Sequence, residues 1–122
     1  MIIISACLLG IKSRYDGKIL KRLSKAAFCL RRIQVVPVCP EQLGGLPTPR
    51  LKVKINDKGR AINEKGKDVT KNFLLGANEV LKIAKLFGIK KAILKSNSPS
   101  CWVNGITAQK LKKAGIKVIW LD

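Results

Sequence analysis

Short apolar runs alternate along the chain with longer stretches of helical periodicity. The apolar runs are rich in Ile and Val and do not alternate with polar residues, which is typical of strands buried on both faces of a parallel sheet. They cover residues 1–4, 33–38, 92–94 and 118–121. Pro37 lies late in the second run, so we expect this strand to end there or to lie near an edge of the sheet.

Between these runs, apolar residues recur at the spacing of amphipathic helices. One stripe covers residues 20–30, a longer one covers 73–84, and a last helix is expected over 106–114. Asp68 is the expected N-cap of the second helix, and Gly88 is its expected C-terminal stop.

Residues 51–63 differ from the rest, because apolar residues alternate with lysines around a turn sequence. They predict a small, half-exposed hairpin. The order of elements is therefore strand, helix, strand, hairpin, helix, strand, helix, strand, which indicates the α/β class. We expect a single domain over residues 1–122, with a mostly parallel four-stranded sheet in the order 2-1-3-4. Helices flank this sheet, and the hairpin is an insertion.

The amino-acid composition limits the kinds of catalytic and binding site that the chain can form. The chain has 25 Lys and Arg, 7 Asp and Glu, a formal net charge of +18 and no histidine. The absence of histidine excludes Ser-His-Asp and Cys-His nucleophiles, histidine-ligated zinc and histidine acid–base catalysis. The basic excess indicates either a surface for RNA or DNA or a solvated lysine-rich surface. Aromatic residues are only 5%, which argues against a stacking platform for single strands.

The sequence also lacks the marks of a membrane protein. No stretch approaches the roughly 18 apolar residues of a spanning helix. The residues around Cys7 look like a lipoprotein processing site, but the apolar run before it is too short and has no basic region. We therefore expect a cytoplasmic protein without a membrane partner. In a reducing compartment, four cysteines are more often ligands, catalysts or core residues than disulfides.

Three of the four cysteines follow predicted strands. Cys7 follows the first, Cys39 the second, and Cys101 lies in the loop after the third. Parallel strands that neighbour one another lie about 4.8 Å apart and end at one edge, so we expect the three thiols to converge there. No cysteine pair has zinc-ribbon spacing. Three thiolates without a fourth protein ligand suit an iron–sulfur cluster with one open iron.

The alternative for each cysteine is a small buried core residue, since free cysteine is among the most buried residue types. This alternative is favoured for Cys29, which lies on a predicted helix. The other three lie in loops rich in Pro, Ser and Gly, where functional residues concentrate.

A series of motifs, in this order along the chain, resembles the thiouracil desulfidase family. The match covers nearly the whole chain, except that the family usually has a long glycine- and aromatic-rich loop after the third cysteine. The motifs are Ser5-Ala6-Cys7-Leu8-Leu9-Gly10, Arg14-Tyr15-Asp16-Gly17, Val36-Pro37-Val38-Cys39-Pro40-Glu41, Gly44-Gly45-Leu46-Pro47-Thr48-Pro49-Arg50, Gly66-Lys67-Asp68-Val69-Thr70, Ser98-Pro99-Ser100-Cys101 and Gly105-Ile106-Thr107-Ala108.

The resemblance implies a [4Fe–4S] cluster held by Cys7, Cys39 and Cys101, whose fourth iron binds the sulfur of a thiolated pyrimidine. The implied reaction is a non-redox desulfuration, in which water replaces sulfur on the ring carbon and sulfide leaves. The implied substrate is a small thiolated base, although some relatives act on thiouridine in tRNA. A further alternative is a metal- or nucleic-acid-binding module that has lost turnover.

Attack by water needs a base, and with no histidine and only seven acidic residues the candidates are few. Glu41, two residues past Cys39, is the candidate general base. Ser98 and Ser100 are candidate donors to the substrate or to a cluster sulfur. The alternatives are an ordinary carboxylate at a helix start for Glu41 and a Ser-Pro-Ser turn for the two serines.

Candidate substrate contacts are Asp16, Arg50 and Trp102. Asp16 precedes a glycine and is alternatively a turn residue. Trp102 stands where the family usually has glycine, and the chain then passes through Val103 and Asn104 directly to Gly105. We expect the Trp102 ring either to stack on a base or to cover the site. Because this loop is missing, the sequence does not define a substrate lid. It therefore does not define the identity of the substrate.

Overall fold

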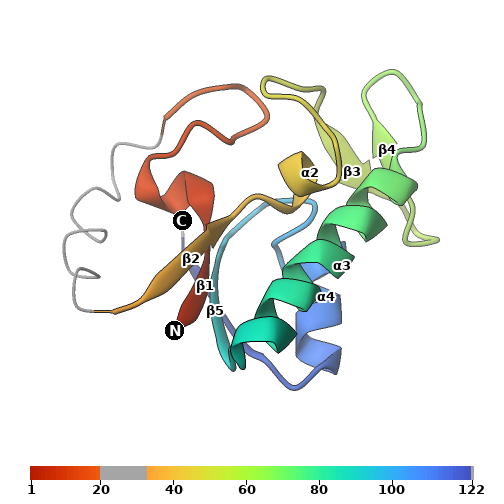
Figure 1. Ribbon diagram of the computed structural model, residues 1–122. Helices are drawn as coiled ribbons and strands as arrows, with labels where there is room; N and C mark the ends of the chain where they lie inside the picture. Colours follow the sequence, from red (N-terminus) through yellow and green to blue (C-terminus); the bar gives the residue numbers. More distant parts are fainter. Residues whose placement is uncertain (20–32, 122) are drawn as a thin grey trace.

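Four parallel strands form the centre of the molecule in this computed structural model, which describes residues 1–19 and 33–121. Their order in the sheet is β2-β1-β5-β6, and each neighbouring pair is parallel. The α/β class and the strand order are therefore confirmed. Figure 1 shows β2, β1 and β5 side by side. The strands are β1 (Ile2–Ser5), β2 (Val35–Val38), β5 (Lys91–Lys95) and β6 (Lys117–Leu121).

The positions of β1 and β2 follow from their sequences. Ile3 and Ile4 are adjacent residues of β1 that are both almost fully buried, as expected for a central strand covered on both faces. Pro37 lies in β2, opposite Ile4, and β2 is an edge strand of the sheet. Proline is tolerated there because an edge strand can lack one backbone donor.

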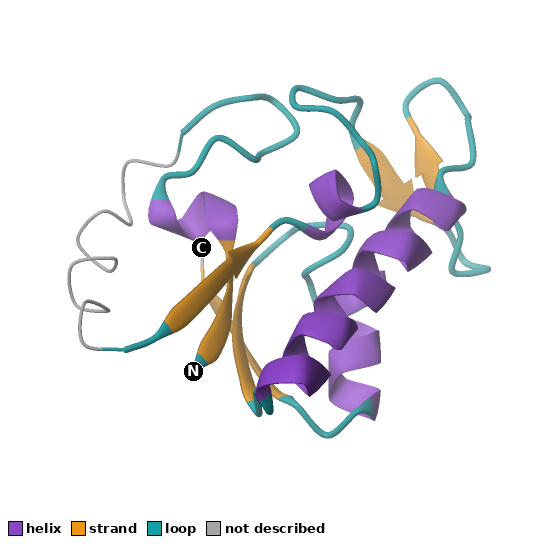
Figure 2. Cartoon of the chain, viewed as in Figure 1, coloured by secondary structure: helices purple, strands orange, loops and turns teal. Residues whose placement is uncertain are grey.

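Two helices, α3 (Thr70–Phe87) and α4 (Ile106–Lys113), lie on the same side of the sheet (Figure 2). Their apolar stripes face the core, as the sequence spacing predicts. Val80 and Ala84 of α3 and Leu111 of α4 are buried in one cluster with residues of the sheet. This packing supports the loops that follow the carboxyl ends of the strands.

The ends of α3 were predicted nearly correctly. Gly88 ends the helix with a φ of 64°, a left-handed conformation that glycine adopts without strain. The N-cap prediction was wrong by one position, because the N-cap is Val69. The Asp68 carboxylate still accepts a hydrogen bond from the N–H of Thr70, over 2.9 Å. Asp68 therefore provides an acceptor for one of the free N–H donors at the start of the helix, from the position before the N-cap.

The predicted hairpin is present as a separate two-stranded antiparallel sheet of β3 (Val53–Ile55) and β4 (Ala61–Asn63). Val53 and Ala61 pack with Phe73 of α3 in a second apolar cluster. The helix predicted over residues 20–30, with Cys29, lies outside the described residues. Within the described ranges, no helix is both long and apolar enough to cross a membrane.

Candidate active site at the carboxyl ends of the strands

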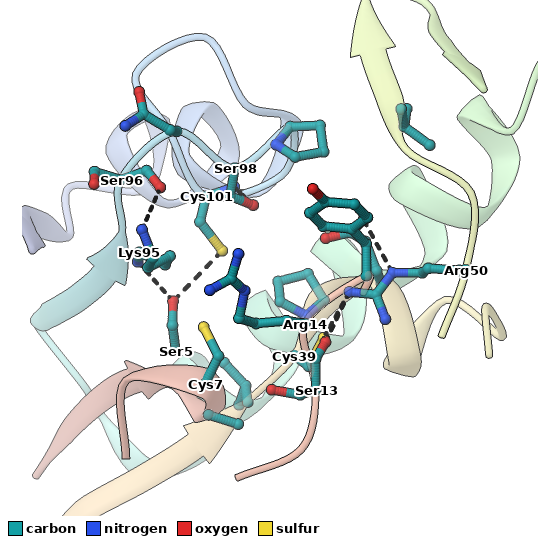
Figure 3. Close-up of a pocket in the computed structure, with 18 of the residues that line it drawn as sticks. Ser5, Cys7, Ser13, Arg14, Cys39, Arg50, Lys95, Ser96, Ser98 and Cys101 are labelled. Atoms are coloured by element: carbon teal, nitrogen blue, oxygen red, sulfur yellow. Dashed lines mark hydrogen bonds and ion pairs between the residues drawn. The ribbon is translucent and has the colours of Figure 1, made fainter. Parts of the chain in front are cut away.

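A cavity of about 270 Å³ lies where β1, β2 and β5 end, and three cysteines line it (Figure 3). Cys7 is in the short 3-10 helix η1 (Ala6–Leu9), which follows β1 directly. Cys39 is the residue between β2 and the short helix α2 (Pro40–Leu43). Cys101 lies in the loop between β5 and α4. The predicted convergence of these cysteines on one cavity is therefore observed.

Local sequence holds each cysteine in place. Gly10 ends η1 with a φ of 82°, a conformation that favours glycine. Pro40 occupies the first position of α2, where its missing N–H costs nothing. In the third loop, the Ser98 hydroxyl oxygen accepts hydrogen bonds from the N–H groups of Ser100 and Cys101, over 3.3 and 3.2 Å. The Ser-Pro-Ser turn, which was the alternative interpretation of the two serines, is therefore present, and it fixes the backbone of Cys101.

The three thiols share an environment that favours their neutral form. Burial, followed by the nearness of Cys101 and Cys39, raises the pKa of Cys7 to about 11. Lys95 and Arg14 act in the opposite direction on that pKa. Burial also raises the pKa of Cys39 and of Cys101. Without a bound cation these groups are therefore thiols at neutral pH, and metal binding would release protons from them.

A buried carboxylate lies beside the thiols. Glu41, in the first turn of α2, lines the cavity and is only 6% exposed. Its Oε1 faces the Arg50 Nε over 3.3 Å, and its Oε2 accepts a hydrogen bond from the Ser100 hydroxyl over 3.2 Å. Charge pairing and hydrogen bonding together offset the cost of burying this group.

Arg50 uses all five of its N–H donors within the protein. Its Nε faces Glu41. One terminal nitrogen donates to the carbonyl of Pro47 and the hydroxyl of Thr48, and the other donates to the carbonyl of Ser13 and the sulfur of Cys39. The side chain is 5% exposed. Arg50 thus ties three segments together around Cys39 and Glu41.

Three glycines allow close backbone approaches behind the cavity. A Cβ at Gly76, inside α3, would overlap the carbonyl oxygen of Pro40, and one at Gly44 would overlap the carbonyl of Asn72. A Cβ at Gly105 would overlap the carbonyl of Ser100. Glycine therefore allows α2 to lie directly on α3 and the third cysteine loop to lie on α4.

Comparisons with known proteins show the family to which the chain belongs. A model of the 2-thiouracil desulfurase family matches residues 2–121. The chain belongs to this family. The Bacillus subtilis (strain 168) protein YbbK, itself uncharacterized, is 34% identical over 147 aligned positions, covering 98% of this chain and 94% of YbbK. The alignment is longer than this chain, so YbbK carries residues that have no counterpart here.

A solved structure, described as the [4Fe–4S]-dependent thiouracil desulfidase TudS, is also similar to this member of the 2-thiouracil desulfurase family. The two share 35% sequence identity, with a TM-score of 0.85. The match covers 98% of this chain and 89% of that one.

The three cysteines at the cavity of this 2-thiouracil desulfurase family chain are the ligand type that iron–sulfur clusters use. Among the residues that the structure describes, no three Cys, Asp or Glu side chains lie close enough to hold one metal ion. In an iron–sulfur cluster each cysteine binds a different iron, so the thiolates surround the group without meeting. Cys7, Cys39 and Cys101 all line one cavity.

The other residues singled out in the sequence lie at different places. Ser98 lines the cavity, whereas Ser100 is fully buried behind it and joins Ser98 to Glu41 by hydrogen bonds. Asp16 lies outside the lining, where it pairs with Arg14 over 3.2 Å and accepts a hydrogen bond from the N–H of Lys18. These contacts agree with its alternative interpretation as a turn residue.

Trp102 does not line the cavity either. Its ring packs edge-to-face on Trp120, with ring centroids 5.7 Å apart. The Trp120 indole N–H in turn donates to the carbonyl of Cys101 over 2.5 Å. The tryptophan pair therefore supports the third cysteine loop from outside the cavity lining.

Sequence reasoning missed three cavity residues with positive charge, Lys95, Arg14 and Lys52. Lys95 is the last residue of β5, and its ammonium donates to the carbonyl of Ser96 over 3.1 Å. Its position was detectable, because the residue that ends a central parallel strand lies at the ligand-binding edge of the sheet. The only sequence feature that marked Arg14 was its place in the motif Arg14-Tyr15-Asp16-Gly17.

Proposed function

We propose that this chain removes sulfur from a thiolated pyrimidine base, with a [4Fe–4S] cluster held by Cys7, Cys39 and Cys101. The observation that carries the proposal is that these three cysteines and the buried Glu41 all line one cavity. When bound, such a cluster would supply a Lewis acid for the thiocarbonyl sulfur at its iron without a protein ligand.

In the proposed reaction, water adds to the ring carbon that bears sulfur, and the carbon–sulfur bond then breaks. The oxygen of water becomes the carbonyl oxygen, and sulfur leaves as hydrogen sulfide. No electrons are exchanged, because carbon keeps its oxidation state.

Glu41 is proposed as the general base that accepts a proton from the attacking water. Each carboxylate oxygen can accept more than one hydrogen bond, so the contacts with Arg50 and Ser100 leave capacity for water. Those contacts also fix the orientation of the carboxylate. Ser98, at the cavity wall, is positioned to donate to the substrate, and Ser100 holds Glu41.

Arg50 is proposed to position Glu41 and Cys39 rather than to bind the substrate, since its donors are all engaged in the protein. The cations that line the cavity without such complete engagement are Lys52, Lys95 and Arg14. They would favour the thiolate forms of the cysteines and any negative charge that develops on the departing sulfur.

The test is anaerobic reconstitution with iron and sulfide, followed by an assay of sulfide release from 2-thiouracil, from 4-thiouridine and from tRNA that contains 4-thiouridine. We expect iron binding and sulfide release from at least one of them. Iron binding should be lost in each of the three variants Cys7→Ser, Cys39→Ser and Cys101→Ser. The control, Cys29→Ser, should still bind iron. Normal iron binding without sulfide release from any substrate would contradict the enzymatic proposal and favour a binding module.

A further inference from the structure

The amino ends of the four parallel strands lie together, at the end of the sheet opposite the cavity. Lys91 begins β5, and Lys95 ends it at the cavity. Along an extended strand these two residues lie about 13 Å apart. The C-terminal ends of α3 and α4 reach the same end of the sheet, because a short turn joins each helix to the next strand (Figure 1). We call this surface the amino edge.

The amino edge carries many positive charges and no carboxylate of its own segments. Residues 80–121 contain nine lysines and neither aspartate nor glutamate. None of the exposed lysines at this edge pairs with a carboxylate of the described part of the chain. They are Lys85, Lys90, Lys91, Lys113 and Lys117.

Helix electrostatics account for only some of these lysines. Lysines in the last turn of a helix interact favourably with its C-terminal dipole, which explains Lys85 and Lys113. Lys91 and Lys117 lie directly opposite each other at the starts of neighbouring strands. Their like charges repel, so their placement costs stability unless an anion binds there.

Large apolar side chains are exposed beside these lysines. Leu86 is 78% exposed and Phe87 is 55% exposed, and both lie in the last turn of α3. Met1, just before β1, and Ile33, just before β2, are also exposed at this edge. Exposed apolar side chains surrounded by lysines are typical of surfaces that bind the boundary between lipid head groups and acyl chains.

We infer that the amino edge binds the surface of an anionic lipid bilayer, with Leu86 and Phe87 entering the interface and the lysines contacting head groups. An aliphatic side chain such as Leu86 gains from acyl chains but has no partner in a nucleic-acid backbone. A second copy of the chain would bring like-charged lysines face to face. Binding in this orientation leaves the cavity directed away from the bilayer, open to water.

This inference does not rest on the proposed desulfuration. It also departs from the expectation of no membrane partner, which considered only segments long enough to cross a bilayer. Association here needs no spanning helix, because attraction of lysines to anionic head groups acts together with a few buried apolar groups.

The test is co-sedimentation of the full chain with vesicles of phosphatidylcholine, with and without phosphatidylglycerol. We expect binding only to vesicles with the anionic lipid, and weaker binding as salt is added. Removing two charges in the Lys90→Gln, Lys91→Gln variant should weaken binding by about 25-fold, at about fivefold per lysine. Leu86→Ser should weaken it by about tenfold.

The matched control is the Lys58→Gln, Lys65→Gln variant, which removes the same charge from two exposed turns, one between β3 and β4 and one directly after β4. It should bind vesicles as the original chain does. Equal weakening in this control would overturn the inference, because the attraction would then depend on net charge alone. Binding to RNA that Leu86→Ser leaves unchanged, together with no binding to vesicles, would assign the amino edge to nucleic acid instead.

Discussion

The hydroxyl of Ser100 donates a hydrogen bond to the Oε2 of Glu41 over 3.2 Å, although the two residues are 59 positions apart in the sequence. Both side chains are buried. This contact joins the loop that carries Cys101 to the helix that follows Cys39. The arrangement of the thiols and the orientation of the carboxylate are thus coupled, and a variant can separate them only if it keeps the shape of the Glu41 side chain.

Glu41→Gln is such a variant, because it keeps the size of the side chain and loses the negative charge. We expect it to bind as much iron as the original chain and to release sulfide at least 100-fold more slowly, the usual scale for loss of a general base. Asp57→Asn, which removes an exposed carboxylate in the hairpin turn, is the matched control. Full activity of the Glu41→Gln variant would remove Glu41 from the mechanism.

Arg50→Ala tests whether this residue positions the site or binds substrate. Removing one partner of a buried ion pair leaves the other uncompensated, so we expect the free energy of unfolding to fall by about 3 kcal/mol. Thermal unfolding and iron content measure the effect, and iron binding should weaken because Cys39 loses its neighbour. If Arg50 instead contacts substrate alone, stability and iron content will stay unchanged while KM rises.

The sequence was sufficient for the sheet and for the cysteines, for physical reasons. Buried parallel strands need continuous apolar runs, and their carboxyl ends share one edge. Cys7, Cys39 and Cys101 could therefore be brought together without knowledge of any side-chain contact. The edge position of β2 was likewise visible in Pro37.

The roles of Arg50 and Trp102 could not be predicted from the sequence in the same way. The acceptors of Arg50 come from separate segments, including Ser13 and Glu41, whose approach depends on packing of the whole domain. Trp102 was assigned to the substrate by residue type, but the direction of its side chain depends on the backbone of a short loop and on Trp120. Gly76 did carry a signal, because a glycine inside a helical stripe often marks a close backbone approach.

The pKa of Cys7 predicts slow alkylation in the metal-free protein. Burial moves this pKa from 9.0 to about 11, so at pH 8 the thiolate fraction is about 100-fold smaller than for an unperturbed thiol. Modification by iodoacetamide, followed by mass spectrometry of the Cys7 peptide, should accelerate about tenfold per pH unit up to about pH 11. The same protein unfolded in urea is the control, and its rate should level off near pH 9.

The same shift predicts how stability depends on pH. Between pH 9 and about 11, the folded metal-free protein keeps a proton on Cys7 that the unfolded chain has released. The free energy of unfolding should therefore fall as pH rises through this interval. Cys7→Ser should flatten the decrease, and an unchanged slope in that variant would assign the pH dependence to other groups.

Gly76→Ala tests whether close contact between α2 and α3 sets the site. The added Cβ would overlap the carbonyl oxygen of Pro40, so α2 must move away and carry Cys39 and Glu41 with it. We expect a lower melting temperature and loss of most bound iron, although alanine by itself favours a helix by about 1 kcal/mol over glycine. Asn78→Ala, at an exposed position of the same helix, is the matched control and should keep its iron. A Gly76→Ala protein that is more stable and retains its iron would show that the site tolerates displacement of α2.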